Sequence, residues 1–256
     1  MDDIIVRECT TINEFDDCVF LQRDVFGLPD LEISPRRHLI VSRQAGGWTL
    51  GAFSGDRLVG FVHHLAGVRK GDELFGYSHM MAVAFDYQNK GVGARLKWSQ
   101  RARAMAEGRG FIKWTWDPMQ ARNAHFNLNR LGVTVSSYAV NFYGTDYPNS
   151  ANTNSANVVG IDSDRLFAEW ALRSSRVERF SKAEAAEIQD EPQRKVVIPA
   201  NWSTLMKEDP ARAKLELERV RTEFQDAFEL GLVCAGFERS TSEPRYLLYR
   251  PEVLSE

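Results

Sequence analysis

The sequence predicts a mixed α/β fold, in which a mostly antiparallel central sheet is flanked by helices and followed by a smaller α+β extension. Three observations predict this class. Apolar runs between residues 48 and 85 are separated by polar turns, which is typical of antiparallel strands. Helical spacing alternates with strand patterns up to about residue 175. One long amphipathic segment and short apolar runs then follow.

The expected elements follow from apolar periodicity and turn residues. A helix begins at Thr11, with Thr11 or Thr10 as its N-cap, and Gly27 ends it, because a threonine cap and a glycine stop enclose an apolar face. Pro29 and Pro35 predict a loop with at most a short helix across residues 28–43. We expect strands at residues 4–6, 48–53, 58–65, 80–85, 111–116, 133–143 and 164–172, and helices at 92–106 and 119–130.

The predicted first domain covers residues 1–175, and the α+β extension covers residues 176–256. The extension contains a linker or surface helix at 181–194, a helix that Asp209 caps, and strands at 196–199, 232–237 and 246–249. Since an apolar helix face is unstable in water, the extension packs on the first domain or forms an interface. The Asn/Ser-rich loop at 144–157 predicts a mobile lid, a solvated loop or an oligomer contact.

Composition indicates an ordinary globular chain. Of its 256 residues, 43% are hydrophobic and 26% are charged, and the net charge of -3 gives no reason to expect nucleic acid or an anionic membrane as a partner. No apolar run approaches the ~20 residues of a transmembrane helix, and no signal peptide precedes the first strand, so we expect a cytoplasmic protein. The three cysteines lack metal-ligand spacing, which predicts buried reduced thiols.

A strand, a turn and a helix start lie at residues 80–96. Gly91 and Gly93 open the helix, where amides from Gln88 to Ala94 lack helical partners and the helix dipole is positive. This layout predicts a cradle for a diphosphate. A dinucleotide fingerprint is excluded because Leu96 stands where the third glycine belongs, and a P-loop is excluded because its Gly-Lys-Ser/Thr is missing.

The run Gln88-x-x-Gly91-x-Gly93 resembles motif A of the GNAT superfamily of acyl-CoA N-acyltransferases, and Ala82-Val83 and Leu96 extend the match. The resemblance implies that acyl-CoA, expected to be acetyl-CoA, binds beside this strand, and that an amide near Ala82 or Val83 stabilises the oxyanion. The residues expected to hold the diphosphate are Gln88, Asn89, Lys90, Gly91, Val92, Gly93 and Ala94.

The catalytic base is less evident from the sequence. Many GNAT enzymes carry a glutamate on the motif A strand, whereas this chain has Tyr77 there and His79 two residues later, on the same strand face. His79 is the expected base, because a free histidine side chain has a pKa of ~6.5 and can accept a proton near neutral pH. The alternative is that His79 is a core histidine. Asp117, at the tip of the next strand, is the second candidate.

The second GNAT motif is only partly present. Ala121 and Leu128 replace the usual asparagine and the tyrosine that protonates the leaving thiolate, while Asn123 is the residue expected to reach CoA from the helix. The run from Asp117 to Gly132 resembles a predicted, largely uncharacterised GNAT subfamily with a C-terminal extension. His63, His64, His79 and His125 lack ligand spacing, so we expect no metal.

The resemblance implies an enzyme that moves an acyl group, expected to be acetyl, from acyl-CoA to an amine by direct attack in a ternary complex. The expected acceptor is a small-molecule amine or an amino acid, succinyl-CoA is the alternative donor, and a homodimer is one option. A non-catalytic acyl-CoA-binding or regulatory module is the alternative function, because the usual glutamate and tyrosine are missing.

Overall fold

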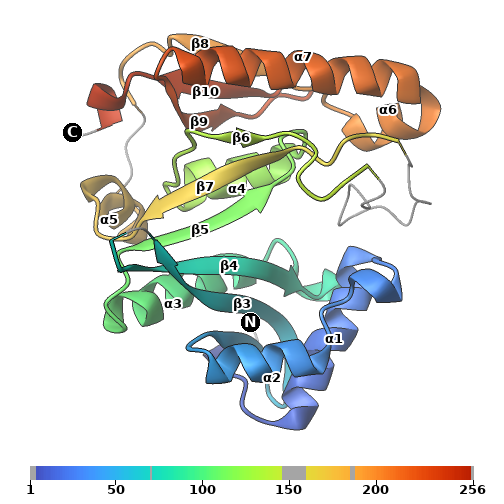
Figure 1. Ribbon diagram of the computed structural model, residues 1–256, viewed down its shortest axis with the longest axis vertical. Helices are drawn as coiled ribbons and strands as arrows, with labels where there is room; N and C mark the ends of the chain where they lie inside the picture. The colour runs from blue at the N-terminus through green and yellow to red at the C-terminus, as the bar shows by residue number, and fades with distance from the viewer. Residues whose placement is uncertain (1–3, 70, 146–159, 185–187, 255–256) are drawn as a thin grey trace. The chain divides into compact units, whose positions relative to one another are not determined.

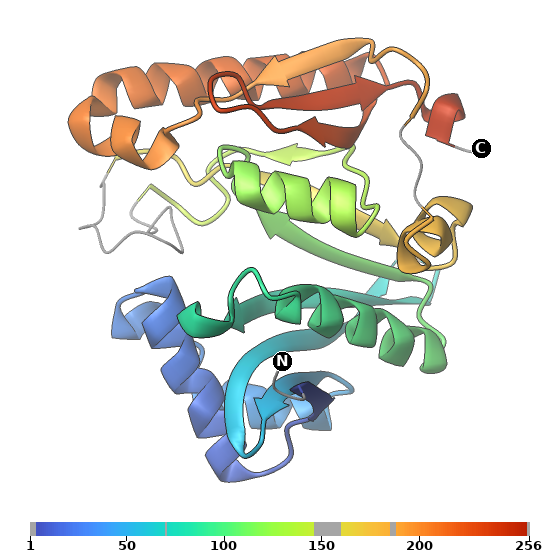
Figure 2. The same cartoon turned by 180° about the vertical axis from the view of Figure 1, so that it is seen from behind.

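The computed structural model describes residues 4–69, 71–145, 160–184 and 188–254 (Figure 1, and from behind in Figure 2). By its internal contacts the chain forms two compact units, and the boundary in sequence lies between Lys113 and Trp114. The predicted domain boundary at residue 175 stays a prediction. Most of the Asn/Ser-rich loop at 144–157 lies outside the described residues.

The first unit is built on a sheet with the strand order β1-β2-β3-β4-β5. Its strands are β1 (Ile4–Glu8), β2 (Trp48–Ser54), β3 (Arg57–Arg69), β4 (Glu73–Val83) and the beginning of β5 (Phe111–Trp116). Neighbours from β1 to β4 are antiparallel, whereas β4 and β5 are parallel. The mostly antiparallel sheet and the predicted strands are confirmed, except that the strand predicted at 80–85 covers Glu73–Val83 and Phe85 begins η2.

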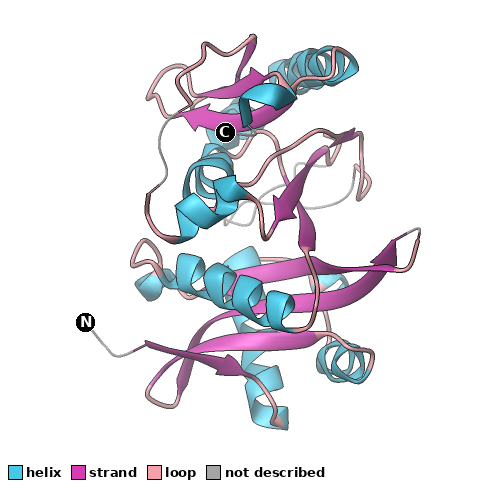
Figure 3. Ribbon diagram, turned by 90° about the vertical axis from the view of Figure 1, so that its left-hand side faces the viewer, coloured by secondary structure: helices cyan, strands magenta, loops and turns pink. Residues whose placement is uncertain are grey.

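Helices cover both faces of this sheet (Figure 3). The helices of the first unit are α1 (Ile12–Phe26), η1 (Asp30–Glu32), α2 (Arg36–Gln44), η2 (Phe85–Tyr87) and α3 (Val92–Ala106). Residues of α1 and α2, among them Phe15 and Leu39, share a core with Phe61 and Ala82 of the sheet. Leu96 of α3 lies against the opposite face, at Gly60.

Local sequence explains both helices that flank the loop at residues 27–35. Thr11 and Glu14 form a capping box at the start of α1, and Gly27 ends the helix with a φ of 60°. The stretch predicted as a loop with at most a short helix contains the nine-residue helix α2 in its second half. Pro35 directly precedes this helix, where its missing N–H breaks no helical hydrogen bond.

The second unit combines the end of β5 with the C-terminal segments. Its strands have the neighbour order β5-β7-β6 at one end of the seven-stranded sheet, and β8-β10-β9 form a separate three-stranded sheet. Its further elements are α4 (Ala121–Arg130), β6 (Tyr138–Ala139), β7 (Arg165–Ala171), α5 (Ser175–Ser181), β8 (Arg194–Val197), α6 (Trp202–Glu208), α7 (Pro210–Glu229), β9 (Val233–Glu238), β10 (Arg245–Tyr249) and η3 (Pro251–Leu254).

The predicted strand at 133–143 is wrong over most of its length, because only Tyr138 and Ala139 form a strand. Thr134 and Val135 make isolated bridges instead, the latter with Cys234 of β9. The predicted cap at Asp209 and the two C-terminal strands are confirmed. All three cysteines are buried and free, as predicted.

Side chains of α4 and α7 connect the C-terminal segments with the rest of the second unit. Asn129 accepts a hydrogen bond from the Phe237 amide at 3.0 Å, so this helix asparagine has a structural role. The Arg221 guanidinium of α7 donates to the buried Asp164 carboxylate at 2.8 Å. A buried carboxylate requires such a partner, since an isolated charge is costly to bury.

Candidate functional site

The candidate site begins where β4 ends. The Ala84 amide donates to the Val59 carbonyl of β3 at 2.9 Å, which is the last main-chain bond from the strand end to β3. The Val83 carbonyl, one residue earlier, accepts from the Gln88 side-chain amide at 3.0 Å. Gln88 of motif A therefore fastens the turn to the strand.

The turn exposes a row of main-chain donors. The Gln88 amide donates to the Phe85 carbonyl at 3.3 Å, so the prediction of a free amide at Gln88 is wrong. From Asn89 to Ala94 no amide has a main-chain partner within the described residues. These six N–H groups precede or open α3, where the helix dipole favours an anion.

Backbone conformation explains the glycine at position 91. Gly91 is the residue before α3 and has a φ of 82°, which side chains rarely tolerate. Asn89 also has a positive φ, of 60°, and asparagine is among the residues that adopt it most readily. A Cβ atom at Gly91 would meet no atom within 4 Å, so the space beside this turn is open.

A β-bulge lies in β4 at His79. His63 of β3 is opposite Met80 and His64 is opposite Ser78, which leaves His79 as the extra residue. Ser78 contacts α3 through Lys97, whereas Met80 packs in the core with α1. The bulge thus allows the adjacent His79 and Met80 to share the face of α1 and α2.

One edge of β4 is largely without a strand partner. Its parallel pairing with β5 comprises only Gly76 and Tyr77 among the described residues. Along a strand, successive amides point to opposite edges. Since the Ala84 amide points to β3, the Ala82 amide, two residues earlier, also points to β3. The Val83 amide points to the free edge, on the same side as its carbonyl.

His79 lies in a group of polar side chains from three segments, namely β4, the loop before α2, and α2. Its Nε2 atom is 3.4 Å from the Ser34 hydroxyl, and its ring is edge-on to His38 of α2 at 5.6 Å between centroids. His79 is partly exposed to solvent. Even so, its pKa is lowered to about 4, mainly by desolvation and to a smaller extent by the charge of His38. The ring is therefore neutral at pH 7 and can accept a proton.

Two further histidines of β3 are fully buried. The ring nitrogens of His63 lie 2.8 Å from the Thr49 hydroxyl and 3.2 Å from that of Ser42. His64 stacks on Trp48, with 4.0 Å between ring centroids. Burial lowers the pKa of each histidine to about 3, so both rings are neutral in the folded protein.

These two rings predict a loss of stability in mild acid. Unfolded histidine binds a proton below pH ~6.5, while His63 and His64 stay neutral down to about pH 3, so the free energy of unfolding falls as pH decreases between these values. As the pH decreases from ~6.5 to ~4.5, each ring lowers the free energy of unfolding by about 2 to 3 kcal/mol. Urea unfolding across this interval measures the loss.

The control for this prediction is His63→Gln. Glutamine keeps hydrogen bonding at the site but does not titrate, so the variant should show a shallower pH dependence over the same interval. A dependence equal to that of the unchanged protein would contradict the assignment to His63.

A buried polar network links β4 with α3 on the other face of the sheet. The Lys97 ammonium group or amine donates to the Ser78 hydroxyl at 3.0 Å and to the Gln100 side-chain carbonyl at 2.7 Å. Burial holds the pKa of Lys97 well below its usual range. The network fixes the helix that follows the amide row against the strand that carries His79.

Asp117 and Asn123 belong to the second unit. The Asp117 carboxylate accepts from the Met119 amide at 2.9 Å and from the Gln120 side chain at 3.3 Å. Burial raises the pKa of Asp117, and Arg165 opposes that effect. Its hydrogen bonds stabilise the turn into α4.

Asn123 is exposed on α4, whereas Asn127, one turn later, is buried.

Sequence reasoning missed Ser34 and His38 as neighbours of His79. Both lie in the stretch predicted as a loop, and neither has a motif spacing relative to His79. Only the packing of α2 on β3 and β4 brings them together. Within the described residues no group of three or more His, Cys, Asp or Glu side chains has the geometry of a metal site.

Comparison with known proteins gives a fold. No protein-family model and no curated protein sequence matches this chain. Among solved structures, it is similar to a protein assigned to the GNAT acetyltransferase family from Desulfovibrio desulfuricans, with a TM-score of 0.52, 13% identity, and coverage of 66% of this chain and 99% of that one.

Two further solved structures give the same result. The ribosomal-protein-S18-alanine N-acetyltransferase from Escherichia coli matches with a TM-score of 0.51 and 12% identity over 66% of this chain and 94% of its own. A GNAT acetyltransferase from Streptococcus pneumoniae matches with a TM-score of 0.50 and 16% identity over 65% of this chain and 98% of its own.

In the described part of the chain, no helix has the length and hydropathy to cross a membrane. The chain has the fold of the GNAT acyl-CoA N-acyltransferases.

Proposed function

We propose that this protein is an acyl-CoA-dependent N-acyltransferase. The observation that carries the proposal is the row of six main-chain amides from Asn89 to Ala94, placed at the start of α3 and separated from a bulged strand by the short helix η2. Amides without partners at a helix N-terminus bind phosphate oxygens, and the GNAT fold gives that row a matching context.

The diphosphate of the acyl-CoA would be held mostly by main-chain groups. Asn89, Lys90, Gly91, Val92, Gly93 and Ala94 supply the amides, and Gln88 stabilises the turn through Val83. Because Gly91 has no side chain and open space beside it, a phosphate can approach its backbone closely. We retain Asn123 as a further CoA contact on the resemblance alone.

In the proposed reaction, the acceptor nitrogen attacks the thioester carbonyl carbon. A C–N bond forms, the C–S bond breaks, and CoA leaves as a thiolate. The oxyanion is stabilised by the Val83 amide, which is better placed than that of Ala82 because it faces the free edge of β4. Thiols titrate at ~8.5, so solvent can protonate the thiolate.

His79 is the proposed base for the proton that the amine loses as the C–N bond forms. Its neutral ring is compatible with this role, and Ser34 and His38 orient it. Tyr77 lies two residues earlier, on the same side of the strand by alternation, and we assign it to the acceptor side of the site. Asp117 stays the second candidate for the base.

The proposed donor is acetyl-CoA, with succinyl-CoA as the alternative, and the proposed acceptor is a small amine or an amino acid. The Escherichia coli protein of the same fold is named for a protein N-terminus as acceptor. One fold serves acceptors of several classes, so the assay includes small amines, amino acids and peptides.

The test is turnover with a panel of acceptors. The full-length protein is incubated with acetyl-CoA or succinyl-CoA and with small amines, amino acids and peptides, while thiol release is recorded. Release that requires both donor and acceptor is the expected result. CoA binding without turnover on any acceptor would favour the non-catalytic acyl-CoA-binding module, and no CoA binding would reject both functions.

A further inference from the structure

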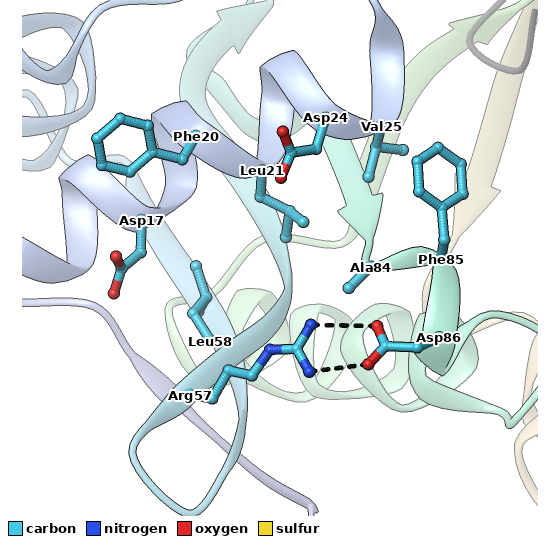
Figure 4. Close-up of a pocket in the computed structure, with 10 residues that line it drawn as sticks. All are labelled: Asp17, Phe20, Leu21, Asp24, Val25, Arg57, Leu58, Ala84, Phe85 and Asp86. Atoms are coloured by element: carbon cyan, nitrogen blue, oxygen red, sulfur yellow. Dashed lines mark hydrogen bonds and ion pairs between the residues drawn. The ribbon is translucent and has the colours of Figure 1, made fainter.

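A hollow of about 500 Å³ lies in the first unit, and none of the residues that line it belongs to the amide row (Figure 4). Its walls come from α1, the first residues of β3, and the chain at the end of β4. Leu21, Leu58 and Ala84 are buried and give it an apolar base. This volume lies within the range of small-molecule sites, about 300 to 1,000 Å³.

The hollow has a net negative charge. Asp17 and Asp24 are seven residues apart on α1, hence on one face of the helix, and both line the hollow. Neither carboxylate has a hydrogen bond or an ion pair with another described residue. The third carboxylate, that of Asp86, is neutralised by a two-pronged pair with Arg57 at 2.8 and 3.2 Å (Figure 4).

Two phenylalanines line the same hollow and are unusually exposed. Phe20 of α1 is 57% exposed and Phe85 of η2 is 60% exposed. Two exposed rings beside one hollow provide an apolar surface that a ligand can cover, and a ring face attracts an organic cation. In Figure 4 the two rings lie on opposite sides of the view, with the Asp24 carboxylate between them.

From these features we propose that the hollow binds a small organic cation, namely an ammonium or guanidinium group attached to an apolar body. The carboxylates of Asp17 and Asp24 would pair with the charge, the exposed rings would pack on the cation, and the apolar base would receive the body. The same carboxylates repel phosphates, so acyl-CoA is excluded from the hollow.

This site is separate from the proposed catalytic position. Phe85 follows His79 by six residues, most of them in an extended strand, so ~15 to 20 Å of chain separates the two. The proposal does not rest on the acyltransferase function, because it uses none of the residues assigned to acyl transfer. It is tested on the full-length protein without acyl-CoA.

The probe is 2-phenylethylammonium, titrated while amide resonances are followed by NMR. Saturable shifts at Leu21, Leu58 and Ala84 are expected, together with weaker binding at higher salt. The matched probes are phenylacetate and 2-phenylethanol, which carry the same ring with a negative charge or none. Equal binding of either matched probe, or no saturable shift with the ammonium, would overturn the proposal.

The variant test is the double substitution Asp17→Asn and Asp24→Asn. Both residues are exposed, so the fold should persist, and the affinity for the ammonium probe should fall at least about fivefold. Asp226→Asn is the matched control, since Asp226 is an exposed carboxylate on α7 that does not line the hollow. Unchanged affinity in the double variant would reject the two carboxylates as the cation's partners.

Discussion

Gly91→Asp is expected to weaken the binding of acetyl-CoA at least ~100-fold, because its carboxylate would occupy the proposed diphosphate position and repel the phosphates. The free protein should tolerate the substitution. No atom lies within 4 Å of a Cβ at this position, so the cost to folding is limited to the left-handed backbone, about 1 kcal/mol. Calorimetric titration of the full-length variant measures the affinity.

Gly71→Asp provides the matched control for Gly91→Asp. Gly71 has a φ of 88°, similar to the 82° of Gly91, and a Cβ there also meets open space. The control adds the same charge and the same backbone strain in the turn between β3 and β4. Its affinity for acetyl-CoA should equal that of the unchanged protein, and equal losses in both variants would argue against a specific cradle.

His79→Ala is expected to lower kcat at least ~100-fold while the affinity for acetyl-CoA changes little, because general base catalysis contributes ~100- to 10,000-fold. In the unchanged enzyme, kcat should fall only as pH decreases toward about 4, since the ring is neutral above its lowered pKa. Steady-state kinetics across acidic pH test both expectations.

Two variants separate proton transfer from packing at His79. His79→Gln keeps a polar side chain beside Ser34 but cannot accept the proton, so it should be as inactive as His79→Ala. Ser34→Ala removes only the hydrogen bond to the ring and should reduce kcat less. A fully active His79→Gln enzyme would reject His79 as the base and leave Asp117 as the candidate.

The cradle could be predicted because its determinants are local. A glycine before a helix, a strand before the turn and the glutamine of motif A lie within a short stretch of sequence, and backbone propensity acts at that range. The capping box at Thr11 and Glu14 was predictable in part for the same reason. The hydrogen bond from the Gln88 side chain to the Val83 carbonyl could not be predicted, because the motif shows only that a glutamine stands at this position.

The surroundings of His79 could not be predicted, because they depend on strand register and on α2. A bulge is an extra residue relative to a partner strand, and the β4 sequence alone does not show which residue of β3 lies opposite His79. The prolines Pro29 and Pro35, which both precede α2, predict a loop with at most a short helix there, so His38 was not placed beside the ring.

Burial of polar residues was the other failure. In α3 the small apolar residues Ala102 and Ala106 are exposed, whereas the polar residues Lys97 and Gln100 are buried. Their mutual hydrogen bonds satisfy the polar atoms, which hydrophobic periodicity does not take into account. The short β6 differs from the predicted strand because its sequence has strand propensity but few residues of β7 pair with it.

The most direct test of the central claim is an NMR titration of the full-length protein with acetyl-CoA. The account predicts that the amides of Asn89 to Ala94 show the largest shifts, because they donate to the diphosphate, and that the Val83 amide shifts with acetyl-CoA but much less with ADP. Binding that leaves the amides from Asn89 to Ala94 unchanged, or no binding, would contradict it.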